Sequence, residues 1–473
     1  MKYLFSMLAL FFLQMEIFAQ STHDISGIWE GKLHANVDIR IVFHFAKDST
    51  GHWTATMDSP DQGVKGIPCG DVSLGGDSLS VQMPSIHGAY FGVFASDRSI
   101  KGKWNQGAQF DLPLKKVEKV STLNRPQTPV PPFPYSSEDV EYESTDKSLR
   151  YGATITTPKT GGPFPAVVLI TGSGAQDRDE TLFEHKPFAV LADYLTRRGL
   201  IVLRVDDRAV GKSTGSFSQS TSLDFVNDVC NSVEYLKTKP GVDLKKIGLI
   251  GHSEGGMIAP MVAVKRNDID FIVLLAGPGE KIEKLMAEQN AAILSSQGVN
   301  EKAVQSFRDF YPSVNESIIQ ATSMEDASAR LSKALDEWIK KTPKNYVLAT
   351  TGISDDSTKN KFTMKMVGAM YSPWFRYFLA FDPQPWLKQL RCKVLALNGE
   401  KDVQVPAHSN LDGIQNALEN SQTKDFEVHA VPGLNHLFQT CKRCTVQEYG
   451  LLEETFSPVA LQMIGDWMDR HVK

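Results

Sequence analysis

The sequence predicts an α/β fold, a mostly parallel sheet covered by helices, preceded by a small all-β domain. Three observations support this prediction. Short runs of Val, Ile and Leu alternate with helical stretches after residue 138, residues 24–119 show strand-like patterning, and a proline-rich stretch separates the two regions. Strands buried on both faces have continuous apolar runs, whereas half-buried strands alternate apolar and polar residues.

Residues 24–119 are expected to form a small antiparallel barrel or sandwich. Residues 37–45 carry an apolar side chain at every odd position, which is the period of a half-buried strand. Further strands are expected at 53–57, 78–83, 90–95, 100–104 and 110–116. Residues 120–137 are then expected to be a linker, because five prolines from Pro126 to Pro134 favour an extended, semi-rigid backbone.

Residues 138–473 are expected to form the parallel sheet with helices on both faces. Its buried strands are expected at 166–170, 201–205, 247–250, 271–275, 394–397 and 426–431. The alternation stops at about residues 280–389, where polar, helix-like spacing leads into an aromatic-rich stretch. Because so long an insertion is not a plain loop, we expect a helical lid there.

The sharpest chemical signal is the sequence Gly-His-Ser-Glu-Gly-Gly at residues 251–256. It follows an expected strand and precedes an apolar helix, and this context exposes the central serine at the carboxyl edge of the sheet. Gly251 and Gly255, two positions to either side, avoid a clash within the tight turn. The pattern therefore predicts Ser253 as a nucleophile.

A serine nucleophile needs a base and a residue that orients the base. Asp402 and His436 each follow an expected strand, in the chain order serine, acid, histidine. His436 would bond Asp402 through one ring nitrogen and take the Ser253 proton with the other. Glu400 is a rival for the acid, and His252 is expected to be structural.

Acyl transfer also needs hydrogen-bond donors for the developing oxyanion. The backbone N–H of Glu254 is one expected donor. The glycine-rich loop after 166–170 is expected to supply the second, from Ser173 or Gly174, with Ser173 preferred. Three lid aromatics are candidates for a substrate pocket or, equally, for plain core: Tyr371, Trp374 and Phe375.

Two other groups of residues are expected to be structural. Asp206, Asp207 and Arg208 end an expected strand and would brace loops through ion pairs. Cys441 and Cys444 are the only closely spaced cysteines, and either a local disulfide or two unpaired thiols fits them. A zinc site would need about four ligands, and no second pair is present.

The first 20 residues are expected to be a cleaved signal peptide. Lys2 precedes an apolar stretch at 3–13 that is too short to span a bilayer, and Ala19 and Ser21 are small residues near a cleavage point. The mature chain is therefore expected to be periplasmic or extracellular, without a membrane anchor. A net charge of −5 and the lack of a Lys/Arg-rich run give no reason to expect nucleic-acid binding.

Residues 138–473 resemble bacterial α/β-hydrolase esterases of the EstD-like group, which are related to acyl-CoA thioesterases and dipeptidyl-peptidase-like hydrolases. The resemblance rests on Gly172-Ser173-Gly174, Asp177-Arg178-Asp179, Asp207-Arg208, residues 251–256 and Asn435-His436. It implies hydrolysis of short-chain esters by Ser253, Asp402 and His436, without a cofactor or metal. Ala209 departs from the pattern, since related chains often have glycine after Asp-Arg.

We therefore expect a serine-dependent carboxylic ester hydrolase that acts on a small-molecule ester through an acyl-enzyme intermediate. An exopeptidase is the alternative within the fold, because the same triad cleaves amides. It would need an acidic anchor for the substrate amine, and the lid offers Glu325, Asp326, Asp355 and Asp356. A lipid- or sugar-binding protein with an inert hydrolase domain is the alternative of another class, which the complete triad argues against.

Overall fold

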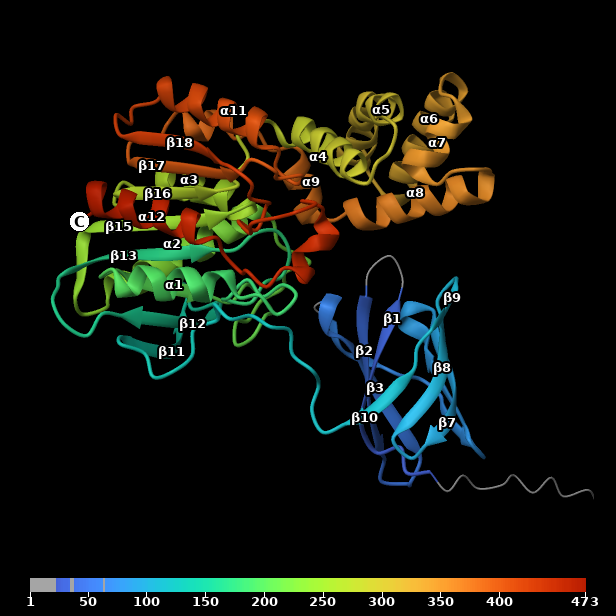
Figure 1. Ribbon diagram of the computed structural model, residues 1–473. Helices are drawn as coiled ribbons and strands as arrows, with labels where there is room; N and C mark the ends of the chain where they lie inside the picture. The colour runs from blue at the N-terminus through green and yellow to red at the C-terminus, as the bar shows by residue number, and fades with distance from the viewer. Residues whose placement is uncertain (1–22, 35–37, 63) are drawn as a thin grey trace, which may run out of the picture. The chain divides into compact units, whose positions relative to one another are not determined.

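The computed structural model describes residues 23–34, 38–62 and 64–473, so the expected signal peptide lies outside the described residues. The chain divides into two compact units, the first ending at Thr122 and the second beginning at Leu123 (Figure 1). Within the described ranges, no helix is both long and apolar enough to cross a membrane.

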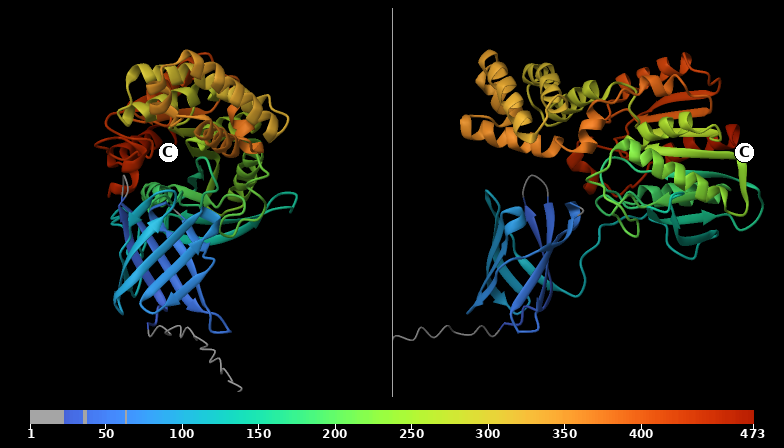
Figure 2. Two further views of the ribbon diagram at one scale, coloured as in Figure 1. Left: turned by 90° about the vertical axis from the view of Figure 1, so that its right-hand side faces the viewer. Right: turned by 180° about the vertical axis from the view of Figure 1, so that it is seen from behind.

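The described part of the first unit is a ten-stranded antiparallel sheet that curls into a barrel-like shape (Figure 2). Its strands are β1 (Gly27–His34), β2 (Asp38–Lys47), β3 (Trp53–Ser59), β4 (Val64–Pro68), β5 (Val72–Gly75), β6 (Ser78–Met83), β7 (Gly88–Ser96), β8 (Ser99–Asn105), β9 (Gln109–Asp111) and β10 (Leu114–Val117). Their order is β4-β3-β2-β1-β10-β8-β7-β6-β5, with β9 on β8. The end strands β4 and β5 are consecutive in the chain, so the sheet turns back on itself.

Side chains fill the interior of this sheet. Trp29, Phe43 and Tyr90 are fully buried, and the rings of Phe43 and Tyr90 lie 5.5 Å apart. Since alternate residues of each strand face inward, the predicted two-residue period supplies this core. The all-β prediction for this unit is confirmed, although β1, β4 and β5 were not foreseen.

The proline-rich segment differs from the predicted linker at 120–137. From Leu123 onward it belongs to the second unit, because its polar side chains bond the backbone of that unit. Gln127 donates a 2.7 Å hydrogen bond to the Phe456 carbonyl. Besides the adjacent Asn124 carbonyl, the guanidinium of Arg125 donates to three distant backbone carbonyls, those of Phe183, Gly450 and Leu452. Composition predicted an extended backbone here but could not reveal these distant partners.

Residues 123–473, all of them described, contain an eight-stranded sheet in the order β11-β12-β14-β13-β15-β16-β17-β18. The strands are β11 (Ser136–Glu143), β12 (Arg150–Thr157), β13 (Phe164–Ile170), β14 (Ile201–Val205), β15 (Val242–His252), β16 (Phe271–Leu275), β17 (Lys393–Gly399) and β18 (Phe426–Val431). β11 and β12 are antiparallel, and the other six strands run parallel. All six predicted buried runs lie in these parallel strands.

Helices cover both faces of this sheet, as expected for buried strands (Figure 1). One face packs against α1 (Pro187–Arg197) and α12 (Pro458–His471). The other face packs against α2 (Ser222–Lys237), α3 (Glu254–Lys265) and α11 (Ala407–Glu419). The strand order and this covering are those of an α/β-hydrolase fold, as predicted.

Seven helices form the predicted lid between β16 and β17 in this fully described unit. They are α4 (Ile282–Ser296), α5 (Glu301–Ile319), α6 (Met324–Lys341), α7 (Lys344–Thr351), α8 (Asp356–Met370), α9 (Pro373–Leu379) and α10 (Gln384–Leu387). α5 and α6 pack through aromatic rings, with Phe310 stacked on Trp338 at 4.7 Å. The lid therefore has a core of its own.

Candidate active site

Ser253 is the single residue between the end of β15 and the start of α3, and its φ is +53°. This left-handed backbone is uncommon for a residue with a side chain and costs about 1–3 kcal/mol. A Cβ on Gly251 would lie 2.0 Å from the Gly255 carbonyl oxygen, and one on Gly255 would lie 2.2 Å from the Ile170 carbonyl oxygen. Only glycine fits at these two positions, as the sequence pattern predicted.

Asp402 and His436 lie just past the ends of β17 and β18, and both are buried. Their side chains meet, with His436 Nδ1 2.7 Å from Asp402 Oδ2. The other Asp402 oxygen accepts the backbone N–H groups of Gln404 and Val405 at 2.7 and 2.9 Å. These bonds fix the carboxylate and leave Nε2 of His436 to exchange a proton. The rival Glu400 is half exposed and accepts from the Gly433 backbone.

Ser253 and His436 line one pocket of about 370 Å³ between the sheet edge and the lid, which we call the site pocket. Gly172, Ser173 and Glu254 line it too. Its apolar lining comprises Leu182, Pro187, Pro278, Leu285, Met286, Trp374, Phe375, Phe378, Val405 and Leu437. The volume is within the range of about 300–1,000 Å³ that is typical of small-molecule sites.

Trp374 and Phe375 lie where the substrate-pocket prediction put them, but Tyr371 does not. Among the described lining residues of the site pocket, Phe378 is the third lid aromatic. The Tyr371 ring instead packs against the Arg376 guanidinium, whose carbon lies 4.9 Å from the ring centre. The reason is geometric, because Tyr371 precedes α9 whereas Trp374, Phe375 and Phe378 lie on it.

The glycine-rich loop after β13 passes directly against the serine. A Cβ on Gly172 would lie 3.2 Å from Ser253 Cβ. The Gly172 N–H donates to Glu180 Oε1 at 2.7 Å, so it is already used. Of the two predicted oxyanion donors in the loop, Ser173 lines the site pocket, whereas Gly174 lines a separate, smaller cavity. The loop geometry thus favours Ser173.

A buried Glu180–His252 pair lies beneath these residues and was missed from the sequence. His252 Nδ1 lies 2.9 Å from Glu180 Oε1, and His252 Nε2 lies 3.0 Å from the His436 carbonyl oxygen. Burial acts to lower the pKa of His252, but the neighbouring Glu180 carboxylate outweighs it and the pKa is raised. A protonated His252 donates to both oxygens. His252 was correctly expected to be structural, but Glu180 carries no local sequence signal.

Asp206 and Asp207 brace the same loop from below, as predicted, although of these two only Asp206 does so through an ion pair. The Arg178 guanidinium donates to Asp206 Oδ2 at 2.6 Å. Asp207 accepts from the Thr171 hydroxyl at 2.9 Å and from the Gln176 backbone N–H at 2.8 Å. Burial raises the pKa of Asp207 to about 8. Asp207 therefore joins the two ends of the loop that carries Ser173.

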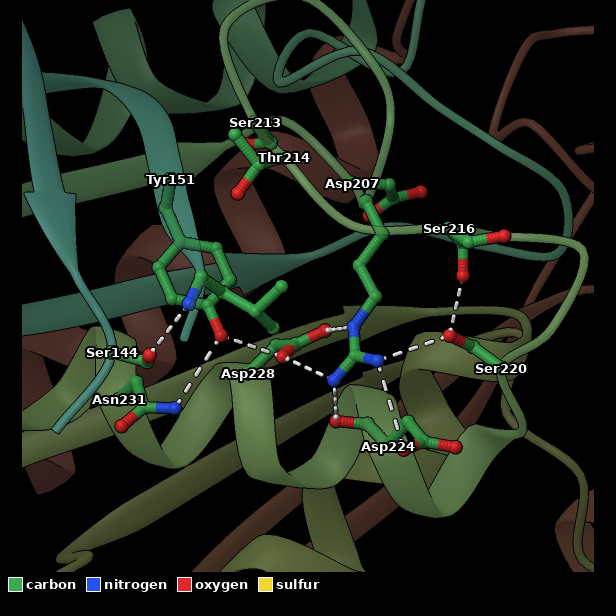
Figure 3. Close-up of polar contacts among 12 residues, drawn as sticks. Ser144, Tyr151, Asp207, Ser213, Thr214, Ser216, Ser220, Asp224, Asp228 and Asn231 are labelled. Atoms are coloured by element: carbon green, nitrogen blue, oxygen red, sulfur yellow. Dashed lines mark hydrogen bonds and ion pairs between the residues drawn. The ribbon is translucent and has the colours of Figure 1, made fainter. Parts of the chain in front are cut away.

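Arg208 points away from the serine and anchors α2. Its guanidinium bonds the Asp228 carboxylate at 2.7 and 2.9 Å and the Ser220 hydroxyl at 3.1 Å. Figure 3 shows Asp228, Ser220 and Tyr151 converging on this point, and the Tyr151 hydroxyl donates to Asp228 at 2.6 Å. This network is structural, as expected.

Cys441 and Cys444 form a disulfide in the loop that follows His436, which settles the choice the sequence left open. The Cys441 N–H donates to the Gly433 carbonyl at 3.1 Å, so the loop is pinned on both sides of His436. Among the described cysteines, Cys69, Cys230 and Cys392 are free thiols.

Three comparisons place the chain among known proteins. It is 36% identical over 135 residues to Esterase EstD of Thermotoga maritima, a match that covers 28% of this chain and 32% of that protein. A Pyrococcus furiosus esterase structure is 14% identical, with 72% of this chain and 94% of that chain covered and a TM-score of 0.40. The α/β hydrolase GrgF of Penicillium sp. sh18 is 15% identical, with 71% and 99% covered and a TM-score of 0.41.

The match to EstD spans about a third of the length of that relative. Residues 148–410, more than half of the chain, match the profile of a family described as X-Pro dipeptidyl-peptidase (S15 family). This region includes the whole lid as well as Ser253 and Asp402, so the chain belongs to the S15 family.

Proposed function

We propose that this chain is a carboxylic ester hydrolase with Ser253 as nucleophile. Ser253 attacks the ester carbonyl while His436 Nε2 takes its proton, and His436 then gives that proton to the leaving alcohol. A water activated by His436 hydrolyses the acyl-enzyme in the second half of the reaction. The observation that carries the proposal is the Asp402–His436 hydrogen bond beside a pocket that Ser253 also lines.

The oxyanion of each tetrahedral intermediate is held by the N–H groups of Glu254 and Ser173 in this proposal. Glu254 is the first residue of α3, so its N–H belongs to the positive end of that helix. The close approach of Gly172 to the Ser253 side chain supports Ser173, the next residue, as the second donor. Such donors are worth about 3–4 kcal/mol of transition-state stabilisation each.

The lining of the site pocket favours a neutral, apolar substrate. Among its 22 described lining residues there is no lysine or arginine, and ten are aliphatic or aromatic apolar residues. Its two carboxyl groups are already hydrogen-bonded, Glu180 to His252 and Glu254 to Ser222. An ester with a short, uncharged acyl group suits this surface. The similarity to Esterase EstD supports the same assignment.

The family match favours an exopeptidase as the second candidate. That activity needs a carboxylate free to bind a terminal amine. Two of the four lid acids considered from the sequence have other partners: Asp355 caps α8 through the Thr358 N–H, and Asp326 bonds the Thr322 N–H and Arg330. With the two pocket acids also engaged, we rank ester hydrolysis first.

Hydrolysis of p-nitrophenyl esters from acetate to octanoate, run beside aminoacyl and dipeptidyl p-nitroanilides, tests the choice. We expect ester turnover that is lost in Ser253→Ala and little turnover of the anilides. Dominant, Ser253-dependent anilide turnover would instead assign the chain as a peptidase.

We also propose that the chain is exported. The basic and apolar start of the sequence supports this, as does the Cys441–Cys444 disulfide, since disulfides persist in oxidising compartments. Expression in a bacterium with a secretory pathway, followed by N-terminal sequencing, should find a mature start at Gln20 or Ser21. An uncleaved Met1 in the cytoplasmic fraction would contradict this.

A further inference from the structure

The side chain of Glu254 is buried beside the site pocket and links three elements. It is 3% exposed, and its Oε1 accepts the Ser222 hydroxyl at 2.6 Å and the Trp374 indole N–H at 2.8 Å. Ser222 begins α2, and Trp374 lies on the lid helix α9. The residue next to the nucleophile is thus bonded directly to the lid.

Trp374 is also a wall of the site pocket. Its ring stacks on Phe378 with centroids 5.5 Å apart and meets the Phe375 ring edge-on at 5.3 Å. All three rings line the pocket. Because the rings pack on one another, a shift of Trp374 would move the whole aromatic wall.

Two anchors hold α9 in place. Arg376 donates to the backbone carbonyls of Ile319 and Ala321, which ties the helix to the end of α5 within the lid. The Trp374–Glu254 bond ties the same helix to the sheet domain. An indole has one N–H and no acceptor, so Trp374 has no second way to make this bond.

We propose that the Glu254 carboxyl is a positioning group that sets substrate selectivity, by fixing the Trp374 wall relative to the oxyanion site. The inference rests on the proposed esterase function. Glu254 then has two roles: its N–H binds the oxyanion, and its side chain holds the surface that receives the apolar acyl group. Among short-chain esters, those favoured over acetate are the ones whose acyl group is long enough to reach that wall.

The chemistry of the bond suits a buried position. Burial raises the pKa of Glu254, while hydrogen bonds from Ser222, Trp374 and Ser173 oppose that rise. The pKa is raised overall, so the three hydrogen-bond donors offset part, but not all, of the cost of burying this carboxyl.

The first test compares Trp374→Phe with Trp338→Phe in the full chain. Both changes keep an aromatic ring and remove one lid indole bond, but Trp338 bonds Ser306 and lies outside the described lining of the site pocket. For Trp374→Phe we expect the ratio of kcat/KM for p-nitrophenyl octanoate to that for acetate to fall about tenfold, because acetate does not reach the wall. An unchanged ratio, as expected for Trp338→Phe, would overturn the proposal.

A second measurement needs no turnover and so separates this inference from the proposed function. In ¹⁵N-tryptophan-labelled protein, the indole signal missing in Trp374→Phe identifies Trp374, and its hydrogen exchange is followed in wild type and Glu254→Met. We expect slow exchange in wild type that becomes at least tenfold faster in Glu254→Met, with Trp338 unchanged in the same sample as evidence of folding. Equal exchange of Trp374 in both proteins would refute the bond as a lid anchor, even if no ester were hydrolysed.

Discussion

At the scale of single residues, Glu180 connects three parts of the site. Its carboxylate bonds the Gly172 N–H, and through His252 it reaches the backbone carbonyl of His436. It has φ at +53°, so its own backbone is strained. A residue with these contacts positions the loop of Ser173 and the loop of His436 together.

Glu180→Gln should lower the raised pKa of His252 and change how stability depends on pH. A histidine whose pKa is higher in the folded than in the unfolded state stabilises the folded protein. This stabilisation is complete below the unfolded-state pKa of about 6.5, and it is lost as pH rises through the folded-state pKa. We therefore expect the wild-type Tm to fall relative to that of Glu180→Gln as pH rises from 6 through the His252 titration. Parallel Tm curves for the two proteins would contradict a charged Glu180–His252 pair.

Ala209 occupies a backbone conformation that favours glycine, with φ at +63°. This conformation fits the glycine that the family pattern implied for this position. Ala209→Gly should raise the free energy of unfolding by about 1 kcal/mol, since alanine carries a left-handed penalty of about 1–2 kcal/mol.

The matched control is Ala334→Gly in the helix α6, where glycine should destabilise by about 1 kcal/mol. Urea denaturation measures both variants. If both substitutions changed the free energy of unfolding in the same direction, Ala209 would not be strained by its positive φ.

At the scale of elements, apolar runs predicted the parallel strands because β13 to β17 are largely buried on both faces, whereas the edge strand β18 is only partly buried. β1 was harder to predict because Gly31 occupies one of its inward-facing positions and interrupts the apolar alternation. A Cβ at Gly31 would lie 2.3 Å from the Pro113 carbonyl oxygen, so close packing against a distant segment dictates the glycine. Such a constraint is visible only once the strands are paired.

The proline-rich segment gives a second prediction at this scale. Arg125→Ala would leave three distant backbone carbonyls without their guanidinium donor and should reduce the stability of the second unit by about 2 kcal/mol. Arg470→Ala, which removes a half-exposed guanidinium that bonds Glu427, should cost less than about 0.5 kcal/mol. Denaturant unfolding measures the free energy of unfolding of both variants. If both substitutions lowered it by the same small amount, the proline-rich segment would be only a spacer.

At the scale of the whole molecule, the order of Ser253, Asp402 and His436 after β15, β17 and β18 was enough to predict that the three residues lie at one edge of the sheet. Parallel strands bring their carboxyl ends to one edge, so three sequence positions far apart converge there. The contacts of Trp374 with Glu254 and of Arg125 with Gly450 and Leu452 could not be predicted, because no periodic pattern links residues so distant. The division at Thr122 also depends on such contacts rather than on composition.

The central claim is that Ser253 is the nucleophile, and covalent labelling tests it most directly. The full chain is treated with a fluorophosphonate, and the modified peptide is identified by mass spectrometry, with Ser253→Ala and His436→Ala treated in parallel. We predict one stoichiometric adduct on Ser253, none on Ser253→Ala, and labelling slowed at least 100-fold in His436→Ala because the general base is missing. An adduct on another residue, or equal labelling of Ser253→Ala, would contradict the assignment.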